Sequence, residues 1–375
     1  MAEKIVKVFF VFLLLLFPLG EIARFDLGNN IAVHAFDMVA VFALFAKKLP
    51  KFILFFVVTL IVSLLVNINN YQTNELITAS FYLLRWVGYA GLYVVVSNFD
   101  KQFKNKIIQL LVGVGAIIVG LGYIQYFLYP NLRNLYYAGW DEHLYRMFST
   151  FLDPNFAGAF FVMYFMFVLG KALENGQSKY YYTILGVLTL EAIFLTYSRS
   201  AYIMFGVALT VFFLLKKQKK LLFWWILGLV LLLPVLFLFS PKSEGTNLLR
   251  TTSSNARVLA MDQAITIIKD NPIFGVGFNA YRYEQEKRGY LGQSTKENHA
   301  GAGTDNSFLF VLATTGAIGF SAYFYLWYSI VRRQKSIVAL SSIAGLFVNA
   351  FFINSLFYPI IMAWIWILTG ITENE

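Results

Sequence analysis

Arginines in short polar runs are the side chains of this sequence with the clearest chemical potential. Arg146, Arg199 and Arg257 each lie in such a run between apolar segments. A guanidinium group is a planar, permanently charged fork that binds two phosphate oxygens at once. For any one arginine, pairing with an acidic side chain is the more ordinary role, and the candidates are Glu21, Asp26, Asp141 and Glu142. For the whole set, the residue types favour a site that holds an anion.

Other polar residues accompany these arginines. Asn155 and Ser198 lie in the same polar runs as Arg146 and Arg199, and we expect them to contact the ligand. Glu191 lies inside an apolar segment, where an ionisable side chain is costly unless it has a partner or a role. We therefore expect Glu191 to support a nearby arginine. The same argument applies with less force to three residues in other apolar segments, His34, Asp37 and Arg85.

The polar interval 240–306 contains a helical pattern, a turn and a closing polar run. Apolar residues recur there at helical spacing and predict an amphipathic helix on the membrane surface, through Val258, Met261, Ile265 and Ile268. Gly275 and Gly277 predict a tight turn with open backbone amides, although a single Gly-x-Gly is a weak phosphate motif. At the end of the interval, Asp305 and Asn306 follow His299, and Asp305 could also be a simple helix cap.

An aromatic cluster precedes the run that contains Arg146, and it consists of Tyr136, Tyr137, Trp140 and Tyr145. These rings could stack on sugar rings. They could equally form an interfacial aromatic belt, which is common in membrane proteins. The sequence leaves both interpretations open.

Composition determines the kind of molecule that must position these residues. The chain has 375 residues, of which 59% are hydrophobic and only 13% charged, and this is too apolar for a soluble domain of such length. It has no cysteine, which excludes disulfides and thiolate chemistry. The formal charge of +10 is expected to anchor cytoplasmic loops, so we predict no nucleic-acid partner.

The fold class is predicted to be an all-α polytopic membrane protein with about twelve transmembrane helices and one large, partly helical extracytoplasmic loop. Residues 1–375 would form a single integral membrane domain, with the loop 240–306 between the ninth and tenth spans. The spans are expected near 5–20, 31–46, 52–67, 79–97, 107–128, 155–173, 180–197, 201–215, 221–239, 307–331, 336–353 and 357–371. The first apolar run lacks a small-x-small cleavage site and is predicted to be retained.

Charge predicts how these spans are oriented. Most lysines fall in alternate loops, which are expected to be cytoplasmic, and both termini lie on that side. Most arginines fall at the opposite, extracytoplasmic face. The arginines there are Arg24, Arg85, Arg133, Arg146, Arg199, Arg250, Arg257, Arg282 and Arg288. The anion site is therefore predicted on the extracytoplasmic face.

Four motifs follow one another along the chain. They are residues 148–155, residues 195–201, Arg257 followed by 272–277, and 305–309 followed by 315–319. In order, spacing and membrane side this set resembles the bacterial O-antigen ligases and O-antigen polymerases, which transfer lipid-linked glycans in the bacterial cytoplasmic (inner) membrane. The resemblance covers about 148–320, and the predicted topology extends it to both ends.

The resemblance implies a metal-independent glycosyltransferase without a cofactor, which moves a glycan from undecaprenyl diphosphate to a hydroxyl of a glycan or lipid acceptor among membrane lipids. Arg199 and Arg257 match the family's two arginines and would hold the diphosphate as the glycosidic bond breaks. Family ligases place a histidine, the candidate base, directly before the asparagine. Here Asp305 precedes Asn306, so either Asp305 or His299 would be the base. This departure favours a surface-polysaccharide polymerase or another transferase over a ligase.

A transporter or flippase for lipid-linked oligosaccharides is the alternative. Transporters bind substrate near the membrane midplane and often have two related halves. This sequence shows no internal repeat, and its polar motifs lie at one face. A structural or sensor protein is a third possibility, which would leave the position of the arginines unexplained.

Overall fold

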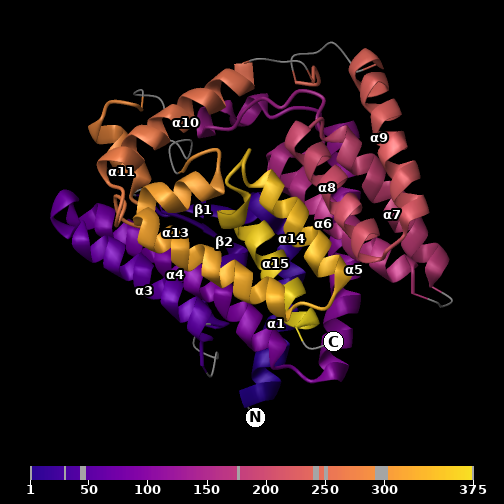
Figure 1. The fold of residues 1–375 in the computed structure, drawn as a ribbon, viewed down its shortest axis with the longest axis horizontal. Coiled ribbons are helices and arrows are strands. Elements are labelled where there is room, and N and C mark those ends of the chain that lie inside the picture. Colours follow the sequence, from indigo (N-terminus) through magenta and orange to yellow (C-terminus); the bar gives the residue numbers. More distant parts are fainter. Residues whose placement is uncertain are drawn as a thin grey trace.

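The computed structural model describes residues 2–28, 31–42, 48–174, 178–239, 245–248, 252–291 and 303–373, and these form a mainly α-helical bundle (Figure 1). The α-helices are α1 (Ala2–Leu16), α3 (Lys51–Val66), α4 (Thr73–Ser97), α5 (Lys101–Leu128), α6 (Pro154–Ala172), α7 (Lys179–Leu195), α8 (Arg199–Leu215), α9 (Lys219–Phe239), α10 (Thr252–Asp270), α11 (Tyr281–Lys287), α13 (Ser307–Arg333), α14 (Ile337–Asn349) and α15 (Pro359–Thr372). Short 3-10 helices occupy Phe17–Ala23, Ala35–Val41, Ile68–Asn70, Arg133–Ala138, Ser149–Phe151 and Ser355–Phe357.

Several of these helices are long and apolar enough to cross a bilayer. In the described part of the chain five meet both criteria, namely Glu3–Ala23, Thr73–Ser97, Lys101–Leu128, Pro154–Ala172 and Ser307–Arg333. Large apolar side chains also remain exposed on outer helix faces, among them Leu54, Phe55 and Leu128. The chain is therefore an integral membrane protein of predominantly α-helical structure.

The second predicted span, 31–46, is wrong in its described part. Residues Ala32–His34 form strand β2, which pairs with β1 (Arg24–Asp26) in antiparallel register, with Arg24 opposite His34. A 3-10 helix, Ala35–Val41, follows directly. The apolar composition predicted an α-helix, but the buried polar side chains His34 and Asp37 take partners in neighbouring segments instead.

The most buried helix is α15, whose residues from Pro359 to Thr372 are all buried. It packs against α4, and α14 packs against α8 in the same way. Glycines allow these close approaches. A Cβ atom at Gly370 would lie 2.9 Å from the carbonyl oxygen of Tyr93, and a Cβ atom at Gly345 would lie 2.9 Å from the carbonyl oxygen of Met204. The site described below is thus supported by a closely packed helical core.

The helix α13 is interrupted at Gly316, and the turn 272–277 forms hydrogen bonds with the backbone on both sides of this interruption. Gly316 has φ 62° and ψ −168°, which interrupts the helical ladder and leaves backbone groups without partners inside the helix. The turn supplies partners on both sides of the break. Its amides donate to the carbonyls of residues 313 and 314, and its carbonyls accept from the amides of residues 317 and 318: Val276 N to Ala313 O (2.9 Å), Gly277 N to Thr314 O (3.0 Å), Ala317 N to Pro272 O (2.8 Å) and Ile318 N to Ile273 O (3.3 Å).

This joint corrects the prediction that Gly275 and Gly277 present open amides to a phosphate. The amide of Gly275 donates to Asn271 O, and that of Gly277 to Thr314 O. Gly275 has φ 65°, and a side chain there would lie 2.4 Å from backbone atoms of the break in α13. The glycines are therefore explained by close packing of the backbone, which the sequence motif alone does not reveal.

Candidate functional site

Four segments meet at a cavity of about 390 Å³, here called the arginine cavity. Its polar wall contains Arg199 at the start of α8, Arg257 in α10, and Asp305 and Asn306 just before α13. Its remaining wall is largely apolar, and includes Ile203, Val258, Met261, Leu309, Phe351 and Phe352. The cavity thus combines two cationic side chains and a carboxylate with a surface suited to hydrocarbon.

The helix predicted from the spacing of Val258, Met261, Ile265 and Ile268 is confirmed, since α10 runs from Thr252 to Asp270. Its predicted apolar face is only partly right. Val258 and Met261 are exposed and line the arginine cavity, whereas Ala264 and Ile267 are the fully buried residues that face the core. Because Arg257 lies next to Val258, the helix brings a guanidinium group and apolar side chains to the same cavity.

Electrostatic interactions link the charged side chains of the arginine cavity. The charge of Arg257 acts on Arg199, and it also acts on the carboxyl of Asp305. Two guanidinium groups in one cavity repel each other, so a bound anion between them would relieve that repulsion. Arg199 also donates from Nη1 to the carbonyl oxygen of Leu248 at 3.5 Å.

Arg146, Asn155 and Ser198 form a cluster behind Arg199. Arg146 is buried and donates from Nε to the carbonyl of Thr196 at 2.9 Å, and Asn155 Oδ1 accepts from the hydroxyl of Ser198 at 2.9 Å. Ser198 is the N-cap residue of α8. These contacts hold the turn that begins α8, so the three residues position Arg199, and none of them lines the arginine cavity.

Asn306, and not Asp305, is the cap of α13. The side-chain oxygen of Asn306 accepts from the amides of Phe308 (2.9 Å) and Leu309 (3.0 Å). The simple helix-cap interpretation of Asp305 is therefore wrong, and Asp305 instead lines the arginine cavity. In α6, by contrast, Asp153 is the cap, as the Asp-Pro sequence predicts.

The environment of Asp305 changes its acidity. The residue has an accessible edge, because it lies in the wall between two cavities, yet the surrounding protein removes much of its water. This desolvation raises the pKa of the Asp305 carboxyl above its ordinary value, Arg257 opposes the rise, and Asp153 and Asp141 add to it. A carboxylate with a raised pKa is a better proton acceptor than an ordinary one.

Pairing with carboxylates accounts for several of the other outer arginines. The pairs in the described chain are Arg24 with Glu21 (3.8 Å), Arg85 with Asp37 (2.6 Å), Arg133 with Glu142, Arg282 with Glu286 (3.4 Å), and Arg288 with both Asp270 and Glu284 (2.7 Å each). The ordinary role is thus right for these side chains. Arg199 and Arg257 are distinguished from them by lining the arginine cavity together.

Glu191 was predicted to support an arginine, and among the described residues its hydrogen-bond partner is a tyrosine. Its carboxylate accepts from the hydroxyl of Tyr123 at 3.0 Å, which links α7 to α5 on an exposed side of the bundle. The tyrosine hydroxyl gives Glu191 a partner without an arginine, and it does so away from the arginine cavity. His299 and Arg250 lie outside the described residues.

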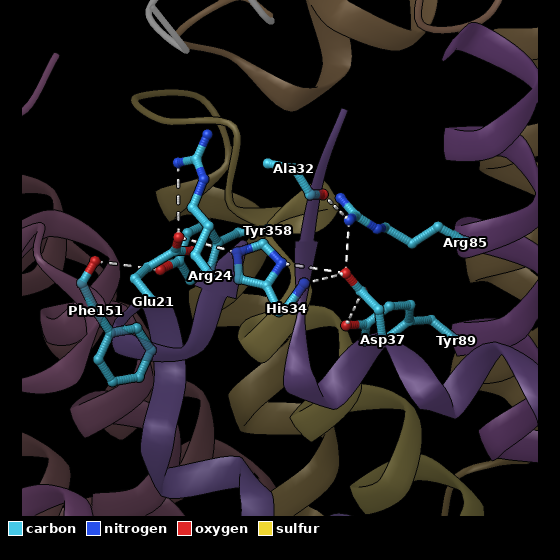
Figure 2. A network of polar contacts seen from close by, with 9 residues as sticks. All are labelled: Glu21, Arg24, Ala32, His34, Asp37, Arg85, Tyr89, Phe151 and Tyr358. Carbon is cyan, nitrogen blue, oxygen red and sulfur yellow. Dashed lines mark hydrogen bonds and ion pairs between the residues drawn. The ribbon is translucent and has the colours of Figure 1, made fainter. Parts of the chain in front are cut away.

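A buried chain of charged groups lies beside this site (Figure 2). His34 contacts Glu21 through Nε2 at 2.9 Å and Asp37 through Nδ1 at 3.2 Å. Asp37 also accepts from Arg85 at 2.6 Å and from the hydroxyl of Tyr89 at 2.9 Å. Both ring nitrogens of His34 face carboxylates, which only accept hydrogen bonds when ionised, so the imidazolium form satisfies both. The apolar sequence around His34 and Asp37 gave only a weak indication of this network.

A helical membrane protein with an arginine-lined, half-apolar cavity is suited to an anionic amphiphile. Residues 184–324 match the family model described as O-Antigen ligase, and this match supports an O-antigen ligase family assignment. Arg199, Arg257 and Asp305 all lie within the matched residues. No curated protein matches the chain. The family implies a glycosyltransferase-like enzyme of the bacterial inner membrane that acts on lipid-linked glycans.

Proposed function

We propose that the protein is a metal-independent glycosyltransferase that takes a glycan from undecaprenyl diphosphate and transfers it to an acceptor hydroxyl, as a surface-polysaccharide polymerase or an O-antigen ligase-like enzyme. The observation that carries the proposal is the meeting of Arg199, Arg257 and Asp305 at one cavity, from three segments that are distant in the sequence. The family assignment supports the same class of reaction.

The donor fits the two kinds of wall in the arginine cavity. Its diphosphate would bind between Arg199 and Arg257, and the first isoprene units would lie along the apolar side chains of α10 and α13. A fixed guanidinium pair stabilises the charge of the departing diphosphate without reorganising, which is the contribution that a divalent metal makes in other transferases.

In the reaction, the bond between the sugar C1 and the diphosphate oxygen breaks, and a bond from C1 to the acceptor oxygen forms. Asp305 would accept the proton of the acceptor hydroxyl, and undecaprenyl diphosphate leaves with the bonding electrons. Arg146, Asn155 and Ser198 hold the start of α8 and thereby fix the position of Arg199. His299 remains a second candidate for the base.

Both termini are proposed to be cytoplasmic and the site extracytoplasmic. In Figure 1 the two chain ends lie at one end of the bundle and α10 at the opposite end, which supports this orientation. With this orientation, the basic loops predicted from the sequence would be cytoplasmic like the termini, as the positive-inside rule expects.

The test is glycan transfer by the purified protein in nanodiscs, with undecaprenyl-diphosphate glycan extracted from bacterial membranes. We expect Arg199→Lys and Arg257→Lys each to lower kcat by roughly 10²–10³-fold, because lysine supplies a point charge in place of a fork. Arg133→Lys is the matched control: Arg133 lies on the same face in an exposed pair with Glu142, and its replacement should leave the rate near wild type.

Wild-type rates for both variants in the cavity would remove the diphosphate clamp from the proposal. A rate abolished by EDTA and restored by a divalent ion would contradict metal independence. Movement of the lipid-linked glycan across a vesicle membrane without any transfer product would identify the flippase. Longer lipid-linked chains would define a polymerase, and product on a different acceptor would define a ligase.

A further inference from the structure

A second cavity, of about 440 Å³, shares a wall with the first. We call it the aromatic cavity, because its lining includes Tyr82, Trp86, Trp140, Phe156, Phe310 and Tyr358. Thr304 and Asp305 line both cavities. The proposed base is therefore accessible from two separate sides, and a group in the aromatic cavity can reach the same carboxylate as a group in the arginine cavity.

The polar lining of the aromatic cavity does not favour a second diphosphate. Its two arginines are already paired, Arg24 with Glu21 and Arg85 with Asp37. Three further carboxylates line it, those of Asp141, Asp153 and Asp305, and they would repel an anion. A neutral ligand with many hydroxyl groups suits this mixture, since carboxylates accept from hydroxyls and aromatic rings pack on the faces of sugar rings.

The floor of the aromatic cavity is rigid. Tyr358 stacks on Phe156 with ring centroids 4.0 Å apart and planes 9° from parallel, and it donates to the carbonyl of Phe151 at 3.3 Å. The network of Glu21, His34 and Asp37 ties the β1–β2 hairpin to α4 through Arg85 (Figure 2), and Glu21, His34 and Arg85 line the same cavity. A preformed floor lowers the entropy lost on binding.

The two cavities share Thr304 and Asp305 but take many of their other lining residues from different parts of the chain. The arginine cavity takes its charged groups from Arg199, Arg257 and Asp305, all inside the matched residues 184–324. The aromatic cavity takes Glu21, Arg24, His34, Tyr82, Trp140 and Tyr358 from outside that match. The charged groups of the arginine cavity thus lie in the matched residues, whereas the aromatic cavity combines matched residues such as Phe278 and Phe310 with residues from outside the match.

We infer that the aromatic cavity binds the carbohydrate acceptor, with Trp140 as a stacking residue that sets acceptor affinity and specificity. This inference rests on the proposed function, because it assigns the acceptor side of the same reaction. The ring of Trp140 lies 5.9 Å from the guanidinium carbon of Arg24, which is itself paired with Glu21. The sugar adjacent to the reacting hydroxyl would pack against this aromatic and polar surface, with its hydroxyl directed to Asp305.

Two probes separate the cavities in nanodiscs of the full-length protein. The first probe is the oligosaccharide that mild acid releases from the lipid-linked glycan of the bacterial cells that make this protein, and it carries neither diphosphate nor lipid. The second probe is inorganic pyrophosphate, which carries no sugar. Binding of each is measured by saturation-transfer NMR and calorimetry. We expect Trp140→Ala to weaken oligosaccharide binding at least 10-fold and to leave pyrophosphate binding unchanged, with Arg257→Lys showing the reverse pattern.

Tyr136→Ala is the matched control, because Tyr136 belongs to the same loop but is 73% exposed and does not line the cavity. Asp141→Asn is a second test at an exposed position, and it should weaken the oligosaccharide several-fold. Unchanged oligosaccharide binding in both Trp140→Ala and Asp141→Asn would overturn the inference. Oligosaccharide binding that is lost only in Arg257→Lys would also overturn it. Oligosaccharide binding that depends on Trp140, without any pyrophosphate binding, would refute the diphosphate clamp and uphold the aromatic cavity.

Discussion

Replacing Asp37 by asparagine tests whether the buried charged network holds the β1–β2 hairpin. Asp37 accepts from the ring and the backbone amide of His34, from Arg85 and from the hydroxyl of Tyr89. The side chains of Asp37 and His34 are only 9% and 8% exposed. Asparagine keeps the shape but removes the carboxylate that pairs with Arg85, and it leaves His34 with Glu21 as its carboxylate partner.

Removing one partner of a buried ion pair costs about 3–5 kcal/mol, because the remaining charge loses its compensation. With ~2 °C per kcal/mol for a large chain, Asp37→Asn should lower Tm by roughly 6–10 °C. The assay is tryptophan fluorescence during heating in nanodiscs. A double variant with Arg85→Gln should lose less than the sum of the single variants, since it removes both charges together.

Glu142→Gln provides the comparison, because it breaks the surface pair with Arg133, whose side chain is 68% exposed. Such pairs contribute about 0–1 kcal/mol, so the shift in Tm should be at most about 2 °C. If Asp37→Asn lowered Tm no more than Glu142→Gln does, the buried network would not stabilise the hairpin. A purely additive double variant would show that Asp37 and Arg85 act independently.

Two further predictions concern the proposed base and the helix joint. Lowering the pH protonates Asp305 and removes the base, so the rate of glycan transfer should fall on the acid side of the pH profile, at a pH above the ordinary aspartate pKa. Asp141→Asn should move this fall in rate to lower pH, because it removes a nearby negative charge that raises the pKa of Asp305. A fall in rate at low pH that is unaffected by Asp305→Asn would exclude this base. Gly275→Ala should lower the free energy of unfolding by about 2–5 kcal/mol, since its Cβ would lie 2.4 Å from Thr314. Gly113→Ala, where nothing lies within 4 Å of the new Cβ, should be neutral or slightly stabilising by the same thermal assay, and equal effects at both positions would contradict the packing argument.

Apolar runs and the order of the motifs predicted much of the fold and of the charged site. Long runs specify helices such as α5 and α13 because every backbone group in a membrane must find a partner within the segment. The joint contribution of Arg199 and Arg257 to one cavity was also foreseeable, because motifs on one membrane side must lie near each other in a small bundle.

The failures have a common physical cause, which is contact between segments distant in the sequence. Residues 31–46 are apolar enough for a span, yet His34 contacts Glu21 and Asp37, and the described residues Ala32–Val41 form a strand and a 3-10 helix. Gly275 looks like part of a phosphate turn until the break in α13 shows what its backbone contacts. Local patterns hold no information about such partners.

The position of Asp305 explains why a carboxylate is compatible with this site although two arginines lie nearby. A carboxylate held by an arginine in a close ion pair would be a poor base, because the pair stabilises its ionised form. Arg257 does act on Asp305 in that direction, but desolvation and the negative charges of Asp153 and Asp141 act against it, and the net direction is upward. Since those two aspartates line the aromatic cavity, the proposed acceptor side would tune the proposed base, and the arginines would remain available to the proposed donor. Because Asp305 lies in the wall between the two cavities, the arginine cavity can contain Arg199 and Arg257 while the proposed proton acceptor is also accessible from the aromatic cavity.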